Sequence, residues 1–188
     1  RPGIMPGSVL ARFEGSPAEN ELFRQGYFHV EGQASQLAAL CVDAQPGETV
    51  IDLCAAPGGK TTQLAAAMQG RGLLVCNEIH PRRAQVLASN IERLGIPNAL
   101  VLSEHPAKLA QRFPGYFDRI LVDAPCSGEG MFRKDEAVIG TWTPERPDFF
   151  AELQREITSD AVKMLRPGGL MLSLIHISEP TRHAQISY

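Results

Sequence analysis

The chain has 188 residues, of which 44% are hydrophobic and 21% charged, which suits one globular domain with a sizeable core and leaves little room for two. Its formal net charge of -3 excludes an overall attraction for nucleic acid, so a polyanionic partner must be held by local patches such as Arg82-Arg83 or Arg133-Lys134. No run approaches the roughly 20 apolar residues of a membrane span, and the cysteines and histidines lack the spacing of a disulfide framework or a zinc site. We therefore expect a monomeric protein of the reduced cytoplasm that binds no metal.

The first 25 residues differ in composition from the rest of the chain. They are rich in glycine, proline and glutamate and lack periodicity, so we expect residues 1–25 to be a linker or the remnant of a preceding region. From Gly26 onward, strand patterns alternate with helical patterns, which predicts an α/β fold with a doubly wound, mostly parallel sheet. Helices are expected over residues 35–42, 61–68, 81–94 and about 150–165, and strands over 49–54, 73–77, 99–102, 119–123 and 170–174.

The loop after the first strand is the most specific local pattern. Its sequence is DLCAAPGGKTT, from Asp52 to Thr62. Cys54 stands where a P-loop needs glycine, and Pro57 lacks an amide donor, so the loop is not a P-loop; nor does it match GxGxxG. Small residues let a bulky ligand approach the backbone, and the amides of the following helix suit a carboxylate. We therefore expect an amino-acid nucleoside as the ligand.

Two further strand ends carry polar chemistry. Glu78 ends the second strand, where doubly wound nucleotide-binding folds hold ribose hydroxyls, although a solvated strand end would look the same. Asp52 has its own alternative, a hydrogen bond that only stabilises the turn. Asp123 to Cys126 follow the strand over residues 117–122. Because parallel strands end at one edge of a sheet, these side chains predict a single crevice.

The motifs DLCAAPGGKTT, NEIHPRRA and DAPCSGEGMFRKD resemble those of the Sun (Fmu) family of S-adenosylmethionine-dependent RNA cytosine-5 methyltransferases, especially the bacterial ribosomal RNA enzymes. The resemblance covers roughly residues 26–172. It implies a class I methyltransferase domain of Rossmann-like fold, S-adenosyl-L-methionine as cofactor, and RNA, ribosomal RNA above all, as partner. It places Glu78 at the cofactor's ribose and Glu104 near its adenine. The other implied cofactor-binding residues are Cys54, Ala55, Ala56, Pro57, Gly58, Gly59, Lys60 and Asp123.

The chemistry of that reaction explains the catalytic residues that the resemblance implies. Carbon 5 of cytosine is a poor nucleophile, so a thiolate first adds to carbon 6; methyl transfer to carbon 5 follows, a base removes the carbon-5 proton, and the thiol is eliminated. Protonation or hydrogen bonding at ring nitrogen 3 favours the addition, and Asp123 resembles the family residue with this role. Lys60, in the same crevice, would orient Asp123 and the base.

Cys126 can be interpreted in more than one way. From the residues alone it is a candidate nucleophile, with a small buried core thiol as the alternative. The resemblance instead gives this cysteine the release of the methylated base, because the family's attacking cysteine belongs to a Thr-Cys pair after the next strand. That pair should fall near Ile175-His176, and it is absent from the sequence.

The sequence departs from the family at two places. Residues 174–188, LIHISEPTRHAQISY, match nothing in it and resemble translated sequencing-adaptor read-through, so we expect a non-native tail and a partial catalytic domain over 26–173 that lacks its C-terminal strands and exposes a sheet edge. Residues 26–35 resemble one branch of the family and 131–135 another, as in a chimeric assembly. The family's usual Gln-Asp or Gln-Glu before Ser35 is replaced, which argues against an RNA contact at Glu31 or Gln33.

RNA contact is expected instead at Arg133 and Lys134, beside the catalytic loop. Arg82 is interpreted as an ordinary solvated charge, and Arg83 as a residue that covers the ribose side of the cofactor. Trp142 is interpreted as a packing residue at the start of a helix rather than a platform for a base.

Three alternatives to RNA cytosine-5 methylation remain open from the sequence. A methyltransferase acting on an exocyclic nitrogen would prefer an Asn-Pro-Pro-aromatic loop, which is absent here. A cofactor- and RNA-binding module without catalysis fits the missing Thr-Cys pair. A non-functional assembly fragment is the third alternative, and it would fail to melt cooperatively.

Overall fold

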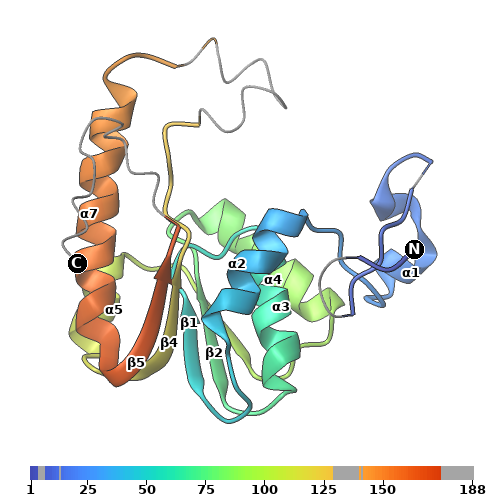
Figure 1. The fold of residues 1–188 in the computed structure, drawn as a ribbon, viewed down its shortest axis with the longest axis horizontal. Helices are drawn as coiled ribbons and strands as arrows, with labels where there is room; N and C mark the ends of the chain where they lie inside the picture. Colours follow the sequence, from blue (N-terminus) through green and yellow to red (C-terminus); the bar gives the residue numbers. More distant parts are fainter. Residues whose placement is uncertain (4–6, 13, 129–139, 141, 175–188) are drawn as a thin grey trace, which may run out of the picture.

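A computed structural model describes residues 1–3, 7–12, 14–128, 140 and 142–174 of the chain. The labels of its elements are those of Figure 1. In chain order the elements are η1 (Pro17–Glu19), α1 (Glu21–Arg24), α2 (Gln33–Val42), β1 (Thr49–Asp52), α3 (Gly59–Met68), β2 (Leu73–Asn77), α4 (Pro81–Arg93), β3 (Ala99–Leu102), α5 (Pro106–Arg112), β4 (Phe117–Val122), α7 (Arg146–Met164) and β5 (Leu165–Ser173).

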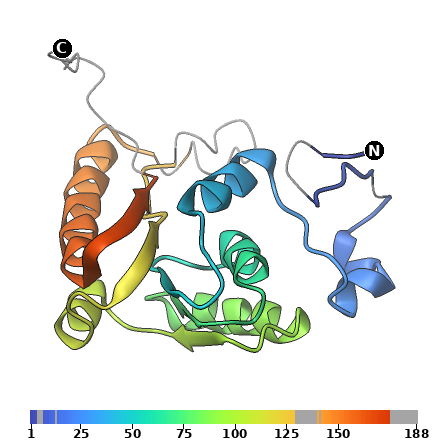
Figure 2. The same ribbon diagram turned by 60° about the horizontal axis from the view of Figure 1, so that its bottom comes forward.

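The strands form one sheet in the order β3-β2-β1-β4-β5, and every neighbouring pair is parallel. The chain winds from β1 outward to β3, returns through α5 to β4 on the other side of β1, and continues to β5. Helices α2, α3 and α4 lie on one face of the sheet and α5 and α7 on the other (Figures 1 and 2). The predicted doubly wound parallel sheet is confirmed, and its order reverses between β1 and β4, where such folds bind ligands.

Two apolar cores lie on the two faces of the sheet, because successive strand residues point to opposite sides. Val50 packs with α2, α3 and α4 in one core, whereas Ile51 packs with α5 and α7 in the other. Both side chains have no exposed surface. A strand with two buried faces is a near-continuous apolar run, which is why the sequence predicts it so clearly.

Three elements of the sheet and its covering helices depart most from the sequence expectation. Helix α5 was not predicted, although Pro106 at its start is a common helix-opening residue. Helix α7 begins at Arg146 rather than near residue 150. Strand β5 begins at Leu165 and contains Pro167-Gly168-Gly169, which were expected only to end the helix. A register shift opposite Asp118 accommodates the Pro-Gly-Gly segment, so the strand pairs with β4 on both sides of it.

The segment before α2 is fastened to the end of α4. The guanidinium of Arg93 lies 4.0 Å from the ring centroid of Phe23, and it donates hydrogen bonds to the carbonyl oxygens of Phe23, at 2.7 Å, and Phe28, at 3.4 Å. Residues 1–25, expected to be a linker or the remnant of a preceding region, include two short helices, η1 and α1, and contacts with α4. No helix in the described part of the chain is long and apolar enough to span a membrane.

Candidate active site

Three cavities adjoin at the carboxyl edge of the sheet, and Asp123 lines all of them. The first, called here the Glu78 cavity, has a volume of about 350 Å³ and extends toward α7. The Glu31 cavity, of about 240 Å³, lies between the segment before α2 and the loop after β1. The Cys126 cavity, of about 420 Å³, lies on the side of α2 and the end of β5. Groups bound in neighbouring cavities would therefore meet at Asp123.

The loop after β1 is held in place by α4. Arg83 donates a hydrogen bond to the carbonyl oxygen of Ala56, and Asn90 donates one to that of Pro57, each at 2.9 Å. Gly58 has φ +110°, a conformation that favours glycine, and as the N-cap of α3 it has no side chain to bond the first-turn amides. Those amides are suited to an anionic ligand.

The loop residues that the resemblance assigns to the cofactor line the Glu31 cavity, with Gly58 the exception. Their side chains are small except for that of Lys60, so the backbone forms much of the wall. The members of the predicted set in this wall are Cys54, Ala55, Ala56, Pro57, Gly59 and Lys60. Cys54 and Ala56 also line the Glu78 cavity, so the loop separates the two spaces.

Asp52 is buried beneath this loop and is only partly satisfied. Its Oδ2 accepts a hydrogen bond from the hydroxyl of Thr61 at 2.6 Å, which stabilises the turn. Its Oδ1 is buried and has no partner among the described residues, and the side chain lines the Glu31 cavity. Burial raises the pKa of Asp52 to about 6, against the lowering by the hydroxyl of Thr61, the ammonium of Lys60 and the backbone amide of Cys54. The free oxygen can accept a donor from a ligand.

Glu78 presents a carboxylate to the larger inner space. The residue is only 2% exposed and lines the Glu78 cavity. Its Oε1 accepts a hydrogen bond from the amide of His80 at 3.0 Å, and its Oε2 lies 3.2 Å from Nη1 of Arg83. The carboxylate at the end of β2 is thus fixed in orientation by His80 and Arg83, and the cover of the cofactor's ribose side by Arg83 stays a prediction.

Glu104 contributes its backbone more than its carboxylate to this region. Its amide donates to Oδ1 of Asn77, and its carbonyl accepts from Nδ2 of Asn77, both at 3.0 Å. The carboxylate pairs with Lys108 at 3.0 Å and accepts from the amide of His105, and these contacts lower its pKa. His105 and Pro106 line the Glu78 cavity here, and Glu104 is absent from the described lining, so the adenine assignment of Glu104 stays a prediction.

Lys60 and Asp123 meet across two loops. The Nζ of Lys60 lies 2.6 Å from Oδ2 of Asp123, and the two side chains are 19% and 39% exposed. Lys60 comes from the first turn of α3, and Asp123 follows β4. The ion pair lies where the Glu31 and Cys126 cavities adjoin, since both residues line both spaces.

The cysteines differ in their access to the site. Cys126 is partly exposed and lines the Cys126 cavity beside Lys60 and Asp123. Burial raises the pKa of the Cys54 thiol to about 12 and that of Cys76 higher still, so both are thiols at neutral pH. Cys41 is exposed and lines none of the three cavities. Of the four cysteines, Cys126 is therefore the one that lines the cavity shared with Lys60 and Asp123.

Two groups of site residues were not found from the sequence. Gln154, only 2% exposed on α7, donates from Nε2 to the carbonyl oxygen of Pro125 at 2.7 Å and so supports the loop that holds Asp123. His29 and Glu31 line the Glu31 cavity. Both groups reach the site through tertiary packing, and no local spacing marks them.

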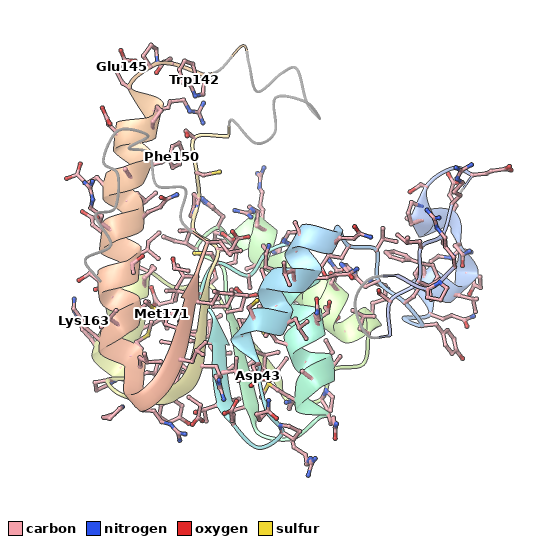
Figure 3. The ribbon with its side chains drawn as sticks, in the orientation of Figure 1. Asp43, Trp142, Glu145, Phe150, Lys163 and Met171 are labelled. Atoms are coloured by element: carbon pink, nitrogen blue, oxygen red, sulfur yellow. The ribbon has the colours of Figure 1, made fainter. Side chains whose placement is uncertain are left out.

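Several sequence predictions fall on residues that the structure does not describe. Arg133 and Lys134, expected to contact RNA, lie outside the described residues, as do residues 175–188 of the expected tail. Trp142 is described and lies just before α7, near Glu145 (Figure 3). In the described ranges, no three His, Cys, Asp or Glu side chains are grouped so that they could hold a metal ion.

Comparison with known sequences gives consistent matches. A family model, 16S rRNA methyltransferase RsmB/F, matches residues 39–178. The ribosomal RNA small subunit methyltransferase F of Escherichia coli O7:K1 is 41% identical over 160 residues, which cover 84% of this chain and 33% of that protein. The chain thus spans about a third of the length of this relative.

Solved structures agree with the sequence matches. The crystal structure of PH0851 superposes with a TM-score of 0.82 and 31% identity, over 86% of this chain and 37% of that one. The structure of NSun6 from Pyrococcus horikoshii with SFG superposes with a TM-score of 0.75 and 29% identity, over 85% of this chain and 41% of that one.

Proposed function

This chain belongs to the 16S rRNA methyltransferase RsmB/F family, within the Sun (Fmu) group, and we propose that it provides the catalytic domain of an enzyme that methylates carbon 5 of cytosine in ribosomal RNA. Its five-stranded parallel sheet is that of class I S-adenosylmethionine-dependent methyltransferases. We assign the catalytic domain to residues 26–173, with residues 1–25 preceding it, and place its action in the cytoplasm, where the ribosomal RNA of bacteria is found.

The cofactor is S-adenosyl-L-methionine, which supplies an activated methyl group on a sulfonium sulfur. The residues present fit it. The fixed carboxylate of Glu78 suits the two ribose hydroxyls, and the small-residue loop from Cys54 to Gly59 admits the methionine part. The unpartnered Oδ1 of Asp52 suits an ammonium group, and the first-turn amides of α3 suit a carboxylate.

The observation that carries the proposal is the position of Asp123 where the three cavities adjoin. On one side lies Glu78, which would hold the nucleoside, and on the other lies Cys126 in a space open to a flipped base. A side chain at this junction can contact a cytosine while the methyl donor lies on its other side. Lys60, 2.6 Å away, fixes the direction of the carboxylate.

For methylation of cytosine carbon 5, Asp123 and Cys126 of the Cys126 cavity each receive a role. As a thiolate adds to carbon 6, ring nitrogen 3 gains a proton from solvent, and the carboxylate of Asp123 accepts a hydrogen bond from the resulting N–H. Loss of the carbon-5 proton after methylation lets the thiol leave, and Cys126 assists this release. The attacking thiol in the family follows the strand that corresponds to β5, and none of the four cysteines of this sequence lies there.

The test has two parts. Calorimetry should detect binding of S-adenosyl-L-methionine, and Glu78→Ala should weaken it about tenfold or more, because charged hydrogen bonds to both ribose hydroxyls are lost. Unchanged affinity would reject the ribose assignment. The exposed Glu92→Gln on α4 is the matched control and should bind as the parent chain does.

The reaction itself is tested in a hybrid enzyme, in which residues 26–173 replace the matching region of the E. coli relative, whose own sequence then follows β5. Ribosomal RNA treated with the hybrid should contain 5-methylcytidine when its nucleosides are separated and weighed by mass spectrometry. Methylation on an exocyclic nitrogen would reject carbon 5 as the target, and no product with bound cofactor would favour a binding module.

A further inference from the structure

The segment before α2 brings two polar side chains to the cofactor loop from outside the sheet. Glu31 and His29 both line the Glu31 cavity. A Cβ at Gly59 would lie 2.9 Å from Oε1 of Glu31 and 3.5 Å from Nε2 of His29, so both groups stand directly over the first residue of α3. Both residues lie in the segment 26–35, outside the three motifs DLCAAPGGKTT, NEIHPRRA and DAPCSGEGMFRKD.

The Glu31 cavity carries more negative than positive charge. Its charged lining residues are the carboxylates of Glu31, Asp52 and Asp123 and the ammonium of Lys60. Lys60 is paired with Asp123 at 2.6 Å, and Oδ1 of Asp52 has no partner among the described residues. Burial raises the pKa of Glu31, against the lowering by Lys60. Such a space is stabilised by a ligand that brings a positive charge.

We propose that Glu31 binds the α-ammonium group of S-adenosyl-L-methionine, together with Oδ1 of Asp52. The inference rests on the proposed function, because it takes the cofactor as the ligand of this cavity. It adds a cofactor-binding residue from the segment before α2. The ammonium would lie between the two carboxylates, and the cofactor's carboxylate would face the first-turn amides of α3.

The neighbouring His29 has a defined tautomer that fits this arrangement. An arginine only donates, so the contact of 3.3 Å between Nη2 of Arg93 and Nδ1 of His29 makes Nδ1 the acceptor. Burial and the charge of Arg93 lower the pKa of His29, so the ring is neutral with its proton on Nε2. That proton, over Gly59, is a donor for the cofactor's carboxylate. Glu31 therefore suits the ammonium group of the cofactor's amino acid, and His29 suits its carboxylate.

The experiment compares two ligands that share the nucleoside. S-adenosyl-L-homocysteine carries the ammonium, whereas 5′-methylthioadenosine lacks the whole amino-acid end. Calorimetry with the full chain should give about a tenfold loss of S-adenosyl-L-homocysteine affinity for Glu31→Gln, and a change within about twofold for 5′-methylthioadenosine. Glu31→Asp, which keeps the charge, should recover part of the loss. Glu92→Gln, on the exposed face of α4, should change neither affinity.

The outcomes separate this inference from the proposed function. Unchanged S-adenosyl-L-homocysteine affinity in Glu31→Gln, or an equal loss for both ligands, would overturn the role of Glu31 at the ammonium. If the parent chain binds neither ligand, the cofactor assignment itself fails. Should Glu31→Gln fail to melt cooperatively, Glu31→Asp alone decides the question. Because aspartate keeps the negative charge, a full loss of about tenfold in S-adenosyl-L-homocysteine affinity in Glu31→Asp would contradict recognition of the ammonium by charge.

Discussion

The ammonium of Lys60 lies 2.6 Å from a carboxylate oxygen of Asp123, and this ion pair joins the first turn of α3, which follows the loop after β1, to the loop after β4. One loop provides the proposed cofactor wall and the other the proposed base-handling side chains. Asp123 also borders the space that Cys126 lines. The pair therefore fixes a carboxylate between the two substrates of the proposed reaction.

Asp123→Asn should separate cofactor binding from methyl transfer. The amide keeps the size of the side chain but loses the charge that Lys60 orients, so base activation is impaired while Glu78 and the small-residue loop still hold the nucleoside. In the hybrid enzyme we expect turnover to fall by about 10²- to 10⁴-fold with the cofactor Kd changed by no more than about threefold. Single-turnover methylation and calorimetry measure the two quantities, and retained turnover would reject the role of Asp123.

Asp52 should make stability fall as the pH rises from about 4 to about 7. Its pKa is about 6 in the folded protein and 3.8 ordinarily. Below pH 3.8 Asp52 is protonated in both the folded and the unfolded state. Between pH 3.8 and about pH 6 it is ionised only in the unfolded state, which favours unfolding. Above about pH 6 it is ionised in both states, and its contribution to the unfolding free energy no longer changes. Each pKa unit corresponds to about 1.4 kcal/mol, so the free energy of unfolding should fall by on the order of 2–3 kcal/mol through this residue.

The variant Asp52→Asn isolates that effect from other carboxylates. Urea unfolding at pH 4, 5, 6 and 7 gives the difference in unfolding free energy between the parent chain and the variant at each pH. Between pH 4 and pH 7 the parent chain should lose on the order of 2–3 kcal/mol of unfolding free energy relative to Asp52→Asn. A difference that stays constant over the range would show that Asp52 does not titrate there.

Gln154 should act on the loop that carries Cys126. Gln154→Leu removes the donor of the 2.7 Å hydrogen bond to the carbonyl of Pro125, an exposed residue, and the loss of this bond should cost about 0.5–1.5 kcal/mol. The thiol of Cys126 should then react faster with a disulfide reagent, measured with the exposed Cys41 changed to serine. Arg155→Gln, an exposed neighbour on α7, is the control, and equal rates in all three proteins would contradict the support role.

The parts of the fold that the sequence predicts are those set by local pattern. Strands β2 and β3 have the predicted bounds, because each is an apolar run that turn residues bound on both sides. The small-residue loop and Glu78 were also predicted in place, since both follow directly from strand ends. Helix α5 was missed because it has only seven residues, too few for a clear helical period.

The parts that the sequence does not predict depend on contacts between distant residues. Gln154 lies 29 positions from Pro125, and His29 lies 64 positions from Arg93. Such contacts are decided by how α7 and the segment before α2 pack on the sheet, and no spacing rule encodes them. For the same reason Glu31 had no assigned role until its place over Gly59 was known.

Gly26 should be required for the seating of Glu31, and Gly47 provides a matched comparison. Both have positive φ, +82° and +94°, so alanine at either position should cost about 1–2 kcal/mol through the backbone. A Cβ at Gly26 would also overlap the carbonyl oxygen of Arg93, whereas a Cβ at Gly47 meets nothing within 4 Å. Gly26→Ala must therefore push the segment before α2 away from α4, and with it His29 and Glu31.

We expect Gly26→Ala to lose more unfolding free energy than Gly47→Ala and to weaken S-adenosyl-L-homocysteine binding, with Gly47→Ala binding as the parent chain does. If Gly26→Ala and Gly47→Ala bind S-adenosyl-L-homocysteine equally well in calorimetry, the contact between Gly26 and α4 is not required for ligand binding, and the prediction is wrong.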